Sequence, residues 1–238
     1  MNDLLSLSDI KTAQSRLPEI IRTTPIVPVS RDAKEIGNET LFLKCENMQV
    51  TGAYKVRAAF TAMQTLSEAD RAGGIVVASS GNFAQAFAYA GRLMKTPVAV
   101  VMLESTSSYK IAQTEGHGGE VIFCGSDAMS RQPTVESVAL ERQMKPIDTW
   151  EYPPLMAGHA SIGMEILQQC PNVKQVLVPV SSGGVAGGVA TAIKLHRPDV
   201  RVVGVQPEQA NAAFLSAKEG KPVEIDNWDT IADGLSAR

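Results

Sequence analysis

The stretch IVVASSGNFAQAFAYAGRLM, residues 75–94, places a strand, a short turn and a helix in direct succession. Its first residues are apolar and β-branched, which favours a strand that is covered on both faces. Small and polar residues follow at once, and apolar residues then recur at helical spacing. A strand that passes through so short a turn into a helix is typical of the βαβ unit of parallel sheets.

The same succession recurs along the chain, which predicts the α/β class with mainly parallel sheets. The predicted strands are IVVAS (75–79), PVAVVM (97–102), EVIFC (120–124), QVLVPV (175–180) and VRVVGV (200–205). Before them, the pattern predicts helices at 8–20 and 53–66 and a short strand at 41–44. Residues 23–29 contain two prolines and should be extended.

The composition excludes several classes of protein. The 238 residues carry a net charge of −3 with no basic run, which disfavours a nucleic-acid or anionic-membrane partner. Cys45, Cys124 and Cys170 are far apart, which disfavours a disulfide framework or a zinc site. Neither a signal peptide nor an apolar stretch of membrane-spanning length is present, so the sequence predicts a cytoplasmic protein.

Two strand ends are candidate anion sites, because ligands of parallel sheets bind where a strand passes into the next helix. At residues 80–83, backbone amides could point at a carboxylate; a Ser or Asn helix cap is an equal alternative. At 181–184, the sequence SSGG joins strand to helix and suits a phosphate. It matches neither a Walker loop nor G-x-G-x-x-G, and tight helix–sheet packing is the alternative.

Lys55 raises a separate question, because it lies between Tyr54 and Val56 at the start of a predicted helix. It is either a surface lysine or a buried amine kept for chemistry. Apolar walls and a positive charge from Arg57 would lower the pKa of the amine and keep it nucleophilic. An amine, a phosphate loop and a carboxylate-binding helix start are together what a pyridoxal-phosphate enzyme requires.

The ordered motifs strengthen this interpretation. They are RTTPIVPVS, LFLKCENMQVTGAYKVRAAF, ASSGNFAQAFAYAGRL, MAGHASIGMEIL, VPVSSGGVAGGVATAIK, GVQPEQA and TIADGL. With them the sequence resembles the fold-type II pyridoxal-phosphate enzymes of the threonine dehydratase and serine racemase family. The resemblance implies a tryptophan synthase β-like α/β fold with parallel three-layer sheets, a large domain (1–73 and 149–238) and a small inserted domain (74–148). It also implies that the C-terminal part of the large domain is missing from this sequence.

The resemblance assigns roles to individual residues. Lys55 matches the Schiff-base lysine, and Asn82 matches the asparagine that binds the ring hydroxyl of pyridoxal 5'-phosphate. Ser80 matches the second catalytic acid/base of serine racemase. The phosphate-binding positions are Ser181, Ser182, Gly183, Gly184 and Val185. The substrate-carboxylate positions are Ser79, Ser80 and Gly81.

Several positions depart from the family pattern and predict a changed substrate pocket. Ser181 and Ser182 stand where glycines are usual. Phe83 replaces a common histidine, and His159 a common glutamine. Further departures are Ala59 and the run from Asp148 to Trp150. At the divalent-metal site of the racemase branch, Gln206 and Ala212 replace both carboxylates, so no metal is expected there.

The resemblance implies β-elimination of a hydroxy-amino acid such as L-threonine or L-serine, giving a 2-oxo acid and ammonia. Three alternatives stay open: an amino-acid racemase that uses Lys55 and Ser80, a catalytically impaired cofactor-binding or regulatory protein, and a nucleotide-binding α/β protein. Arg131 either reaches a substrate carboxylate or is an exposed residue at a helix start, and the second is the expectation. The family implies a homo-oligomer, a dimer or a tetramer.

Overall fold

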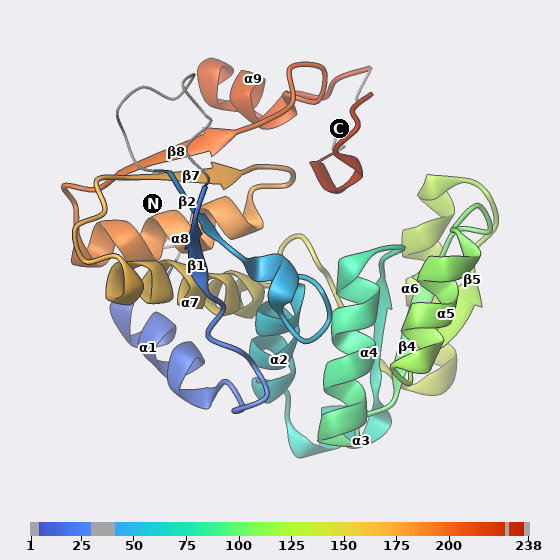
Figure 1. Ribbon diagram of the computed structural model, residues 1–238. Helices are drawn as coiled ribbons and strands as arrows, with labels where there is room; N and C mark the ends of the chain where they lie inside the picture. The colour runs from blue at the N-terminus through green and yellow to red at the C-terminus, as the bar shows by residue number, and fades with distance from the viewer. Residues whose placement is uncertain (1–4, 30–40, 227–228, 236–238) are drawn as a thin grey trace. The chain divides into compact units, whose positions relative to one another are not determined.

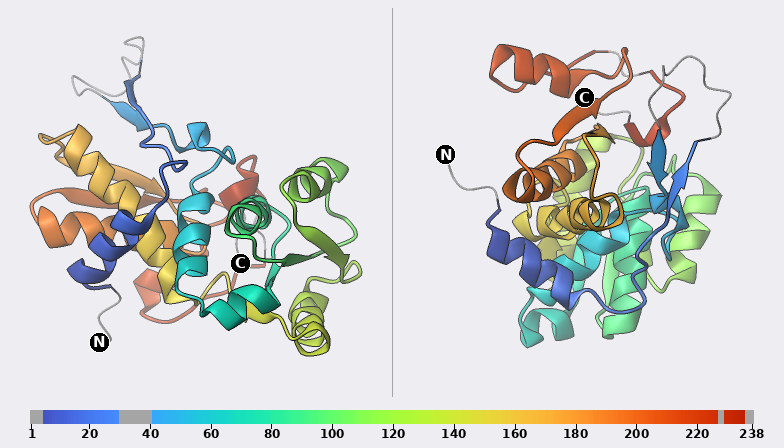
Figure 2. Two further views of the ribbon diagram at one scale, coloured as in Figure 1. Left: turned by 90° about the horizontal axis from the view of Figure 1, so that it is seen from below. Right: turned by 60° about the vertical axis from the view of Figure 1, so that its left-hand side comes forward.

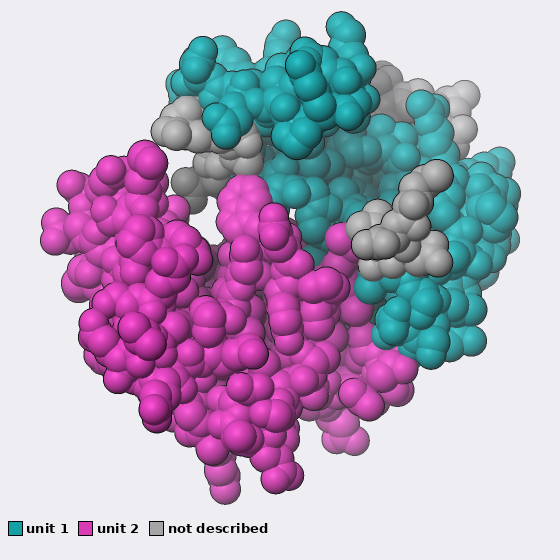
Figure 3. Space-filling view, turned by 180° about the vertical axis from the view of Figure 1, so that it is seen from behind, with its two compact units in different colours: residues 1–11, 159–238 teal, residues 12–158 magenta. Residues whose placement is uncertain are grey.

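The computed structural model describes residues 5–29, 41–226 and 229–235. The chain divides into two compact units, residues 1–11 with 159–238 (unit 1) and residues 12–158 (unit 2), coloured separately in Figure 3. Helix α1 (Leu7–Arg16) and helix α7 (Pro153–Gln169) each contribute residues to both units. This division differs from the predicted boundaries, and the inserted domain at 74–148 stays a prediction.

Unit 2 is built on a four-stranded parallel sheet with the order β5-β4-β3-β6. Its strands are β3 (Ile75–Ala78), β4 (Val98–Met102), β5 (Glu120–Phe123) and β6 (Lys145–Ile147). The central strands β3 and β4 are almost wholly buried, as their continuous apolar runs predict. The sequence pattern did not predict the edge strand β6, because this strand is short and contains Pro146.

Helices cover both faces of this sheet and make the three layers expected from the resemblance. Helices α2 (Lys55–Gln64) and α4 (Asn82–Met94) share one apolar core with Ile75 and Val77 of β3. Helix α6 (Arg131–Arg142) packs on the opposite face, against Val76. Figure 2 shows the green α4 and the yellow-green α6 on the two sides of the strands. Helices α3 (Glu68–Gly73) and α5 (Ser108–Gly116) complete the connections.

The N-terminal part of unit 2 forms a small antiparallel sheet that precedes α2 in the chain. Strand β1 (Ile26–Pro28) pairs with β2 (Phe42–Lys44), with Ile26 opposite Lys44. The 3-10 turn η2 (Glu46–Met48) follows β2 directly. The helix predicted at 8–20 ends at Arg16, because the residue before Pro18 is disfavoured in helical conformation.

Unit 1 contains the parallel pair β7 (Gln175–Pro179) and β8 (Arg201–Val205), with α8 (Gly184–His196), α9 (Ala212–Glu219) and the 3-10 turn η4 (Asp233–Leu235) (Figure 1). Gly163 of α7 allows close helix packing, since a Cβ there would lie 2.9 Å from the Val189 carbonyl oxygen of α8. Burial alternates along β7, with Val176 and Val178 buried and Leu177 exposed. The prediction of strands covered on both faces therefore fails for β7 within the described chain.

No helix in the described ranges is both long and apolar enough to span a bilayer. The same residues hold no group of three or more His, Cys, Asp or Glu side chains suited to a metal ion. At the positions predicted to lack metal ligands, Gln206 Oε1 accepts a hydrogen bond from the Phe214 amide at 2.9 Å, and Ala212 begins α9. The absence of a metal in the functional protein stays a prediction.

Candidate active site

Lys55 is the first residue of α2, and its amine is enclosed by aromatic rings. The Nζ atom lies 4.7 Å from the ring centre of Tyr54 and 4.2 Å from that of Phe83. Burial lowers the pKa of Lys55 from 10.5 to about 8, and it raises the pKa of Tyr54 to about 12. Lys55 is therefore a largely enclosed amine rather than a surface lysine.

Two effects of these surroundings oppose each other at Lys55. Aromatic faces attract the charged ammonium by about 0.5–2 kcal/mol. Lowering a pKa from 10.5 to about 8 corresponds to roughly 3 kcal/mol in favour of the neutral amine. The loss of water therefore outweighs the ring attraction, and burial shifts the amine toward its neutral, nucleophilic form.

Arg57 does not act on this amine in the way expected from the sequence. Its side chain is fully buried, and its Nε and Nη2 atoms each donate to the Glu46 carboxylate at 2.9 Å. Nη2 also donates to the carbonyl of Arg22 at 3.0 Å. The positive charge is therefore compensated within a structural ion pair, and burial alone lowers the pKa of Lys55. The expectation that Arg57 helps to lower it is wrong.

The turn from β3 into α4 carries residues 79–82, and within it the Gly81 amide donates to Ser79 Oγ at 3.3 Å. Gly81 is the N-terminal cap of α4, and no side chain caps this helix start. The alternative of a Ser or Asn helix cap is therefore wrong. A Cβ at Gly81 would meet no described atom within 4 Å. Because the first amides of a helix have no acceptor within it, the amides at the start of α4 itself remain available to a ligand.

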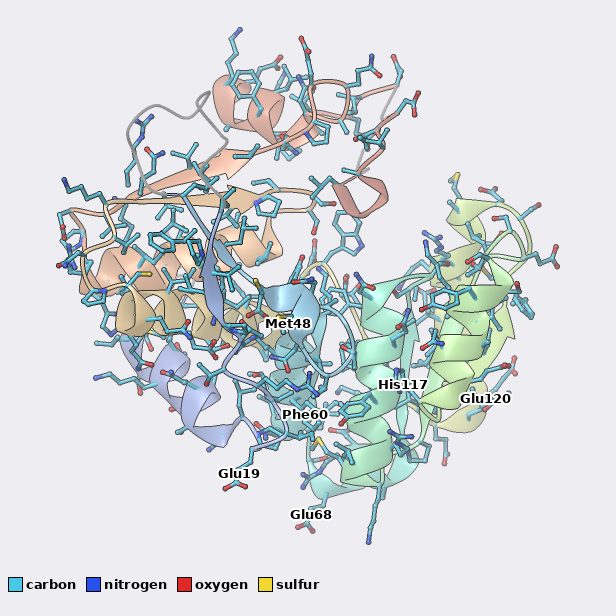
Figure 4. The ribbon with its side chains drawn as sticks, viewed as in Figure 1. Glu19, Met48, Phe60, Glu68, His117 and Glu120 are labelled. Atoms are coloured by element: carbon cyan, nitrogen blue, oxygen red, sulfur yellow. The ribbon has the colours of Figure 1, made fainter. Side chains whose placement is uncertain are left out.

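The structure brings Lys55 to this turn. Phe83, which contacts the Lys55 amine, is the second residue of α4 and directly follows Asn82. It also stacks on Phe87 one turn later, with ring centres 5.9 Å apart. Phe60 of α2, labelled in Figure 4, meets Tyr89 of α4 edge-on at 6.4 Å. These contacts fix α2 against α4, so the amine lies at the N-terminal end of α4.

Ser80 lies at the centre of a small polar cluster in unit 2. Thr106 Oγ1 donates to Ser80 Oγ at 3.0 Å, and Arg131 Nη2 donates to the same oxygen at 3.4 Å. The Nε atom of Arg131 is buried and has no hydrogen-bond partner among the described residues. The expectation of an exposed arginine at a helix start is wrong, because Arg131 is half-buried and directed at Ser80.

The second candidate loop, residues 181–185, lies in unit 1 between β7 and α8. Gly183 has a φ of +91°, a conformation that strongly favours glycine. A Cβ at Gly183 would meet no described atom within 4 Å, and one at Gly184 would lie 3.8 Å from the ring of His159. These glycines therefore leave an open backbone, which disfavours the packing alternative. His159 is buried beside the loop, a position that the sequence left undecided.

The structure thus groups the predicted residues in two sets. In unit 2, Lys55 lies at the helix start that carries Ser79, Ser80, Gly81 and Asn82, whose side chain is exposed. In unit 1, Ser181, Ser182, Gly183, Gly184 and Val185 form the open entrance of α8. The hydrogen bond from Thr106 to Ser80 could not be predicted from the sequence, because the two residues lie 26 positions apart and no local pattern links them.

Comparison with known proteins supports a common family. Residues 17–238 match the family described as "Pyridoxal-phosphate dependent enzyme". The L-threonine ammonia-lyase of Geobacter sulfurreducens is 34% identical over 235 residues, which are 99% of this chain and 58% of that protein. The catabolic L-threonine dehydratase TdcB of Staphylococcus aureus (strain N315) is also 34% identical, over 99% of this chain and 68% of its own length.

Solved structures agree with this assignment. Maize serine racemase superimposes with a TM-score of 0.94 at 30% identity, covering 98% of this chain and 71% of that one. The processed form of threonine deaminase isoform 2 from Solanum lycopersicum has a TM-score of 0.89 at 30% identity, over 97% of this chain and 66% of its own. The α/β fold with parallel sheets is therefore confirmed, and the chain belongs to the family of pyridoxal-phosphate dependent enzymes.

Proposed function

We propose that this protein catalyses β-elimination of a hydroxy-amino acid such as L-threonine or L-serine, giving a 2-oxo acid and ammonia. The observation that carries the proposal is the Lys55 amine, which has a lowered pKa and lies at the open N-terminal end of α4. Relatives named as threonine dehydratases and ammonia-lyases support the same reaction class.

The residues present fit pyridoxal 5'-phosphate. Lys55 would hold the aldehyde carbon of the cofactor, since a neutral amine is the form that attacks a carbonyl. Asn82 would bind the ring hydroxyl. The open backbone of residues 181–185, at the N-terminus of a 13-residue helix, would bind the phosphate. The left-handed conformation of Gly183 directs this backbone without a side chain in the way.

The cofactor supplies an electron sink that takes up the negative charge left when the substrate loses its α-proton. The other contributions come from the chain. Lys55 Nζ removes the α-proton, and its apolar surroundings favour the neutral amine that can accept it. Backbone amides at Ser80 and Asn82, together with the Ser79 hydroxyl, hold the substrate carboxylate and orient the Cα–H bond. The Gly81 amide, which donates to Ser79 Oγ at 3.3 Å, orients that hydroxyl.

Racemisation is the second candidate, because the polar cluster around Ser80 offers a second proton-transfer group. A cofactor-binding protein without catalysis is the third. Incubation with L-serine and L-threonine separates the three. Release of 2-oxo acid supports elimination, formation of the D-enantiomer without 2-oxo acid supports racemisation, and a cofactor absorbance band without either product supports a binding protein.

The direct test is Lys55→Ala. The change removes both the anchor for the cofactor and the base, so we expect turnover and the visible absorbance of the bound cofactor to disappear together. Lys174→Ala, at an exposed lysine before β7, is the matched control and should keep both. A Lys55→Ala protein that retains turnover contradicts the proposal.

The domain boundaries and the assembly are also part of the proposal. We expect a small domain at 74–148 inserted into a large domain formed by 1–73 and 149–238. A homo-oligomer, either a dimer or a tetramer, is expected by analogy with the family. Sedimentation equilibrium of the purified protein measures the assembly, and a monomer at all concentrations contradicts that part alone.

A further inference from the structure

Phe83 presents the face of its ring to the Lys55 amine and is held firmly in that position. The Nζ atom lies 4.2 Å from the ring centre. The ring also stacks on Phe87, with ring centres 5.9 Å apart and planes inclined by 29°, and Phe87 is fully buried in the apolar core. Phe83 itself is only half-buried. The ring is therefore fixed at the amine and keeps some exposed surface.

The chemistry proposed for Lys55 decides which part of a substrate meets this ring. The Cα atom of an amino acid carries a hydrogen, an amino group, a carboxylate and a side chain. In the proposed reaction the hydrogen points at Lys55 Nζ, the amino group is joined to the cofactor, and the carboxylate lies at the turn of residues 79–82. The side chain is the one substituent that remains to contact Phe83.

The distances suit such a contact. Reacting atoms in a productive complex lie about 3–3.5 Å apart, so the substrate Cα lies about that far from Nζ. The ring centre is 4.2 Å from the same nitrogen, and a group attached to Cβ can therefore reach the ring. The negative face of an aromatic ring repels a carboxylate and packs well against apolar groups. A Cβ built at Gly81 would meet no described atom within 4 Å, so the adjoining turn leaves room.

We infer that Phe83 is a specificity-determining residue that selects 3-hydroxy-amino acids with an apolar, preferably aromatic, substituent on Cβ. This inference rests on the proposed function and names its substrate class. The elimination itself is unchanged: the Cα–H and Cβ–O bonds break, and hydrolysis gives the 2-oxo acid and ammonia. At the place of the substituent, L-serine has hydrogen, L-threonine has a methyl group and L-threo-3-phenylserine has a phenyl ring. Activity should rise in that order.

A second wall of the site would favour a different substrate. Arg131 is charged and half-buried, and its Nη2 atom lies 3.4 Å from Ser80 Oγ. A substrate with a second carboxylate, such as L-threo-3-hydroxyaspartate, could pair with this guanidinium. Phe83 contacts the reacting amine directly, whereas Arg131 contacts the turn through Ser80. We therefore expect the apolar substrates to be preferred over the acidic one.

The test compares these four amino acids as substrates of the holoenzyme. Elimination releases ammonia from each of them, so one assay gives all four values of kcat/KM. All four share the proton transfer to Lys55. A variant that changes only this lysine, or only the amount of bound cofactor, therefore leaves the ratios between the four values unaltered. The ratios report the recognition of the side chain alone.

In the unaltered protein, kcat/KM for threonine should exceed that for serine about tenfold or more, since one carbon in an apolar pocket changes kcat/KM about 10–200-fold. Phenylserine should exceed threonine by a further factor of about five, because paired aromatic rings gain beyond their buried area. Phe83→His makes the wall polar and should lower the threonine-to-serine ratio at least about threefold. Phe83→Leu should keep that ratio and lose the extra preference for phenylserine.

Phe214→His, at an exposed phenylalanine of α9, is the matched control and should keep every ratio. Ratios that are the same in the unaltered protein and in both Phe83 variants overturn the inference. So does a preference for hydroxyaspartate, which would assign the side-chain pocket to Arg131. In both cases ammonia release still supports the proposed function.

The absence of ammonia from all four substrates, in protein that shows the absorbance of bound cofactor, refutes the proposed function and the inference with it. A thermal melt and the cofactor absorbance show whether each variant is folded and loaded. The ranking of the four substrates by the unaltered protein tests the inference without any substitution. A ranking with serine first contradicts it even if neither Phe83 variant folds.

Discussion

The turns at residues 79–82 and 181–184 look alike in sequence but use glycine differently. Each joins a parallel strand to a helix of 13 residues. Gly81 has φ −140°, which other residues also adopt, and its amide donates to the Ser79 hydroxyl oxygen at 3.3 Å. Gly183 has φ +91°, which few others tolerate. The turn at residues 79–82 therefore offers a ligand both backbone and side-chain groups. The turn at residues 181–184 relies on its backbone conformation.

The same substitution at both turns gives the sharpest test of this difference. Gly183→Ala forces a left-handed conformation on a residue with a Cβ, which costs about 1–2 kcal/mol. We expect it to raise the dissociation constant for pyridoxal 5'-phosphate about fivefold to thirtyfold, measured by fluorescence titration of cofactor-free protein. Gly81→Ala is the control, and it should bind the cofactor as the unaltered protein does. Equal increases of the dissociation constant in the two variants would show that Gly81 and Gly183 do not differ in this way.

The pH dependence of cofactor uptake should also distinguish the two turns, because only the turn at residues 79–82 has a titrating amine beside it. The neutral form of Lys55 is the one that captures the aldehyde, so the rate of cofactor uptake should rise with pH. With the pKa of Lys55 at about 8, the rate should be half-maximal near pH 8. Stopped-flow absorbance measures it, and a midpoint near the ordinary lysine value of 10.5 would show that burial does not tune the amine.

The same shift has a consequence for stability. The pKa of Lys55 in the folded protein is below that of the unfolded chain, so folding disfavours proton binding. The free energy of unfolding of cofactor-free protein should therefore rise between about pH 8 and pH 10.5, by on the order of 2–3 kcal/mol. Urea titrations measure it. In Lys55→Met this contribution should be absent, and an unchanged slope would assign it to other groups.

The smallest expected effect concerns the ring that covers the amine. Phe83→His replaces an apolar ring with a polar one and reduces the loss of hydration at Lys55. The pKa of Lys55 should rise toward its usual range by up to about one unit, which would shift the uptake midpoint upward. Phe83→Leu keeps the site apolar but removes the ring attraction for the ammonium, so the midpoint should fall by up to about one unit. A rise of the midpoint in both variants would contradict this account.

Much of this architecture could be predicted from local sequence. The continuous apolar runs of β3 and β4 predicted buried parallel strands, and the small residues after β3 and β7 predicted the two open turns. The short strand β6 and helices α3 and α9 were missed, because short elements carry weak periodicity. Tertiary contacts could not be predicted, because no local sequence pattern indicates that Arg57 pairs with Glu46 or that Arg131 donates a hydrogen bond to Ser80.

The internal pair of Arg57 and Glu46 ties the 3-10 turn η2 to the helix whose first residue is Lys55. The Arg57 side chain is fully buried, so its charge depends on the Glu46 carboxylate for compensation. Removing one partner of a buried ion pair typically costs about 3–5 kcal/mol. A change such as Glu46→Gln, in a turn outside the candidate site, would therefore loosen the helix start that holds the reactive lysine.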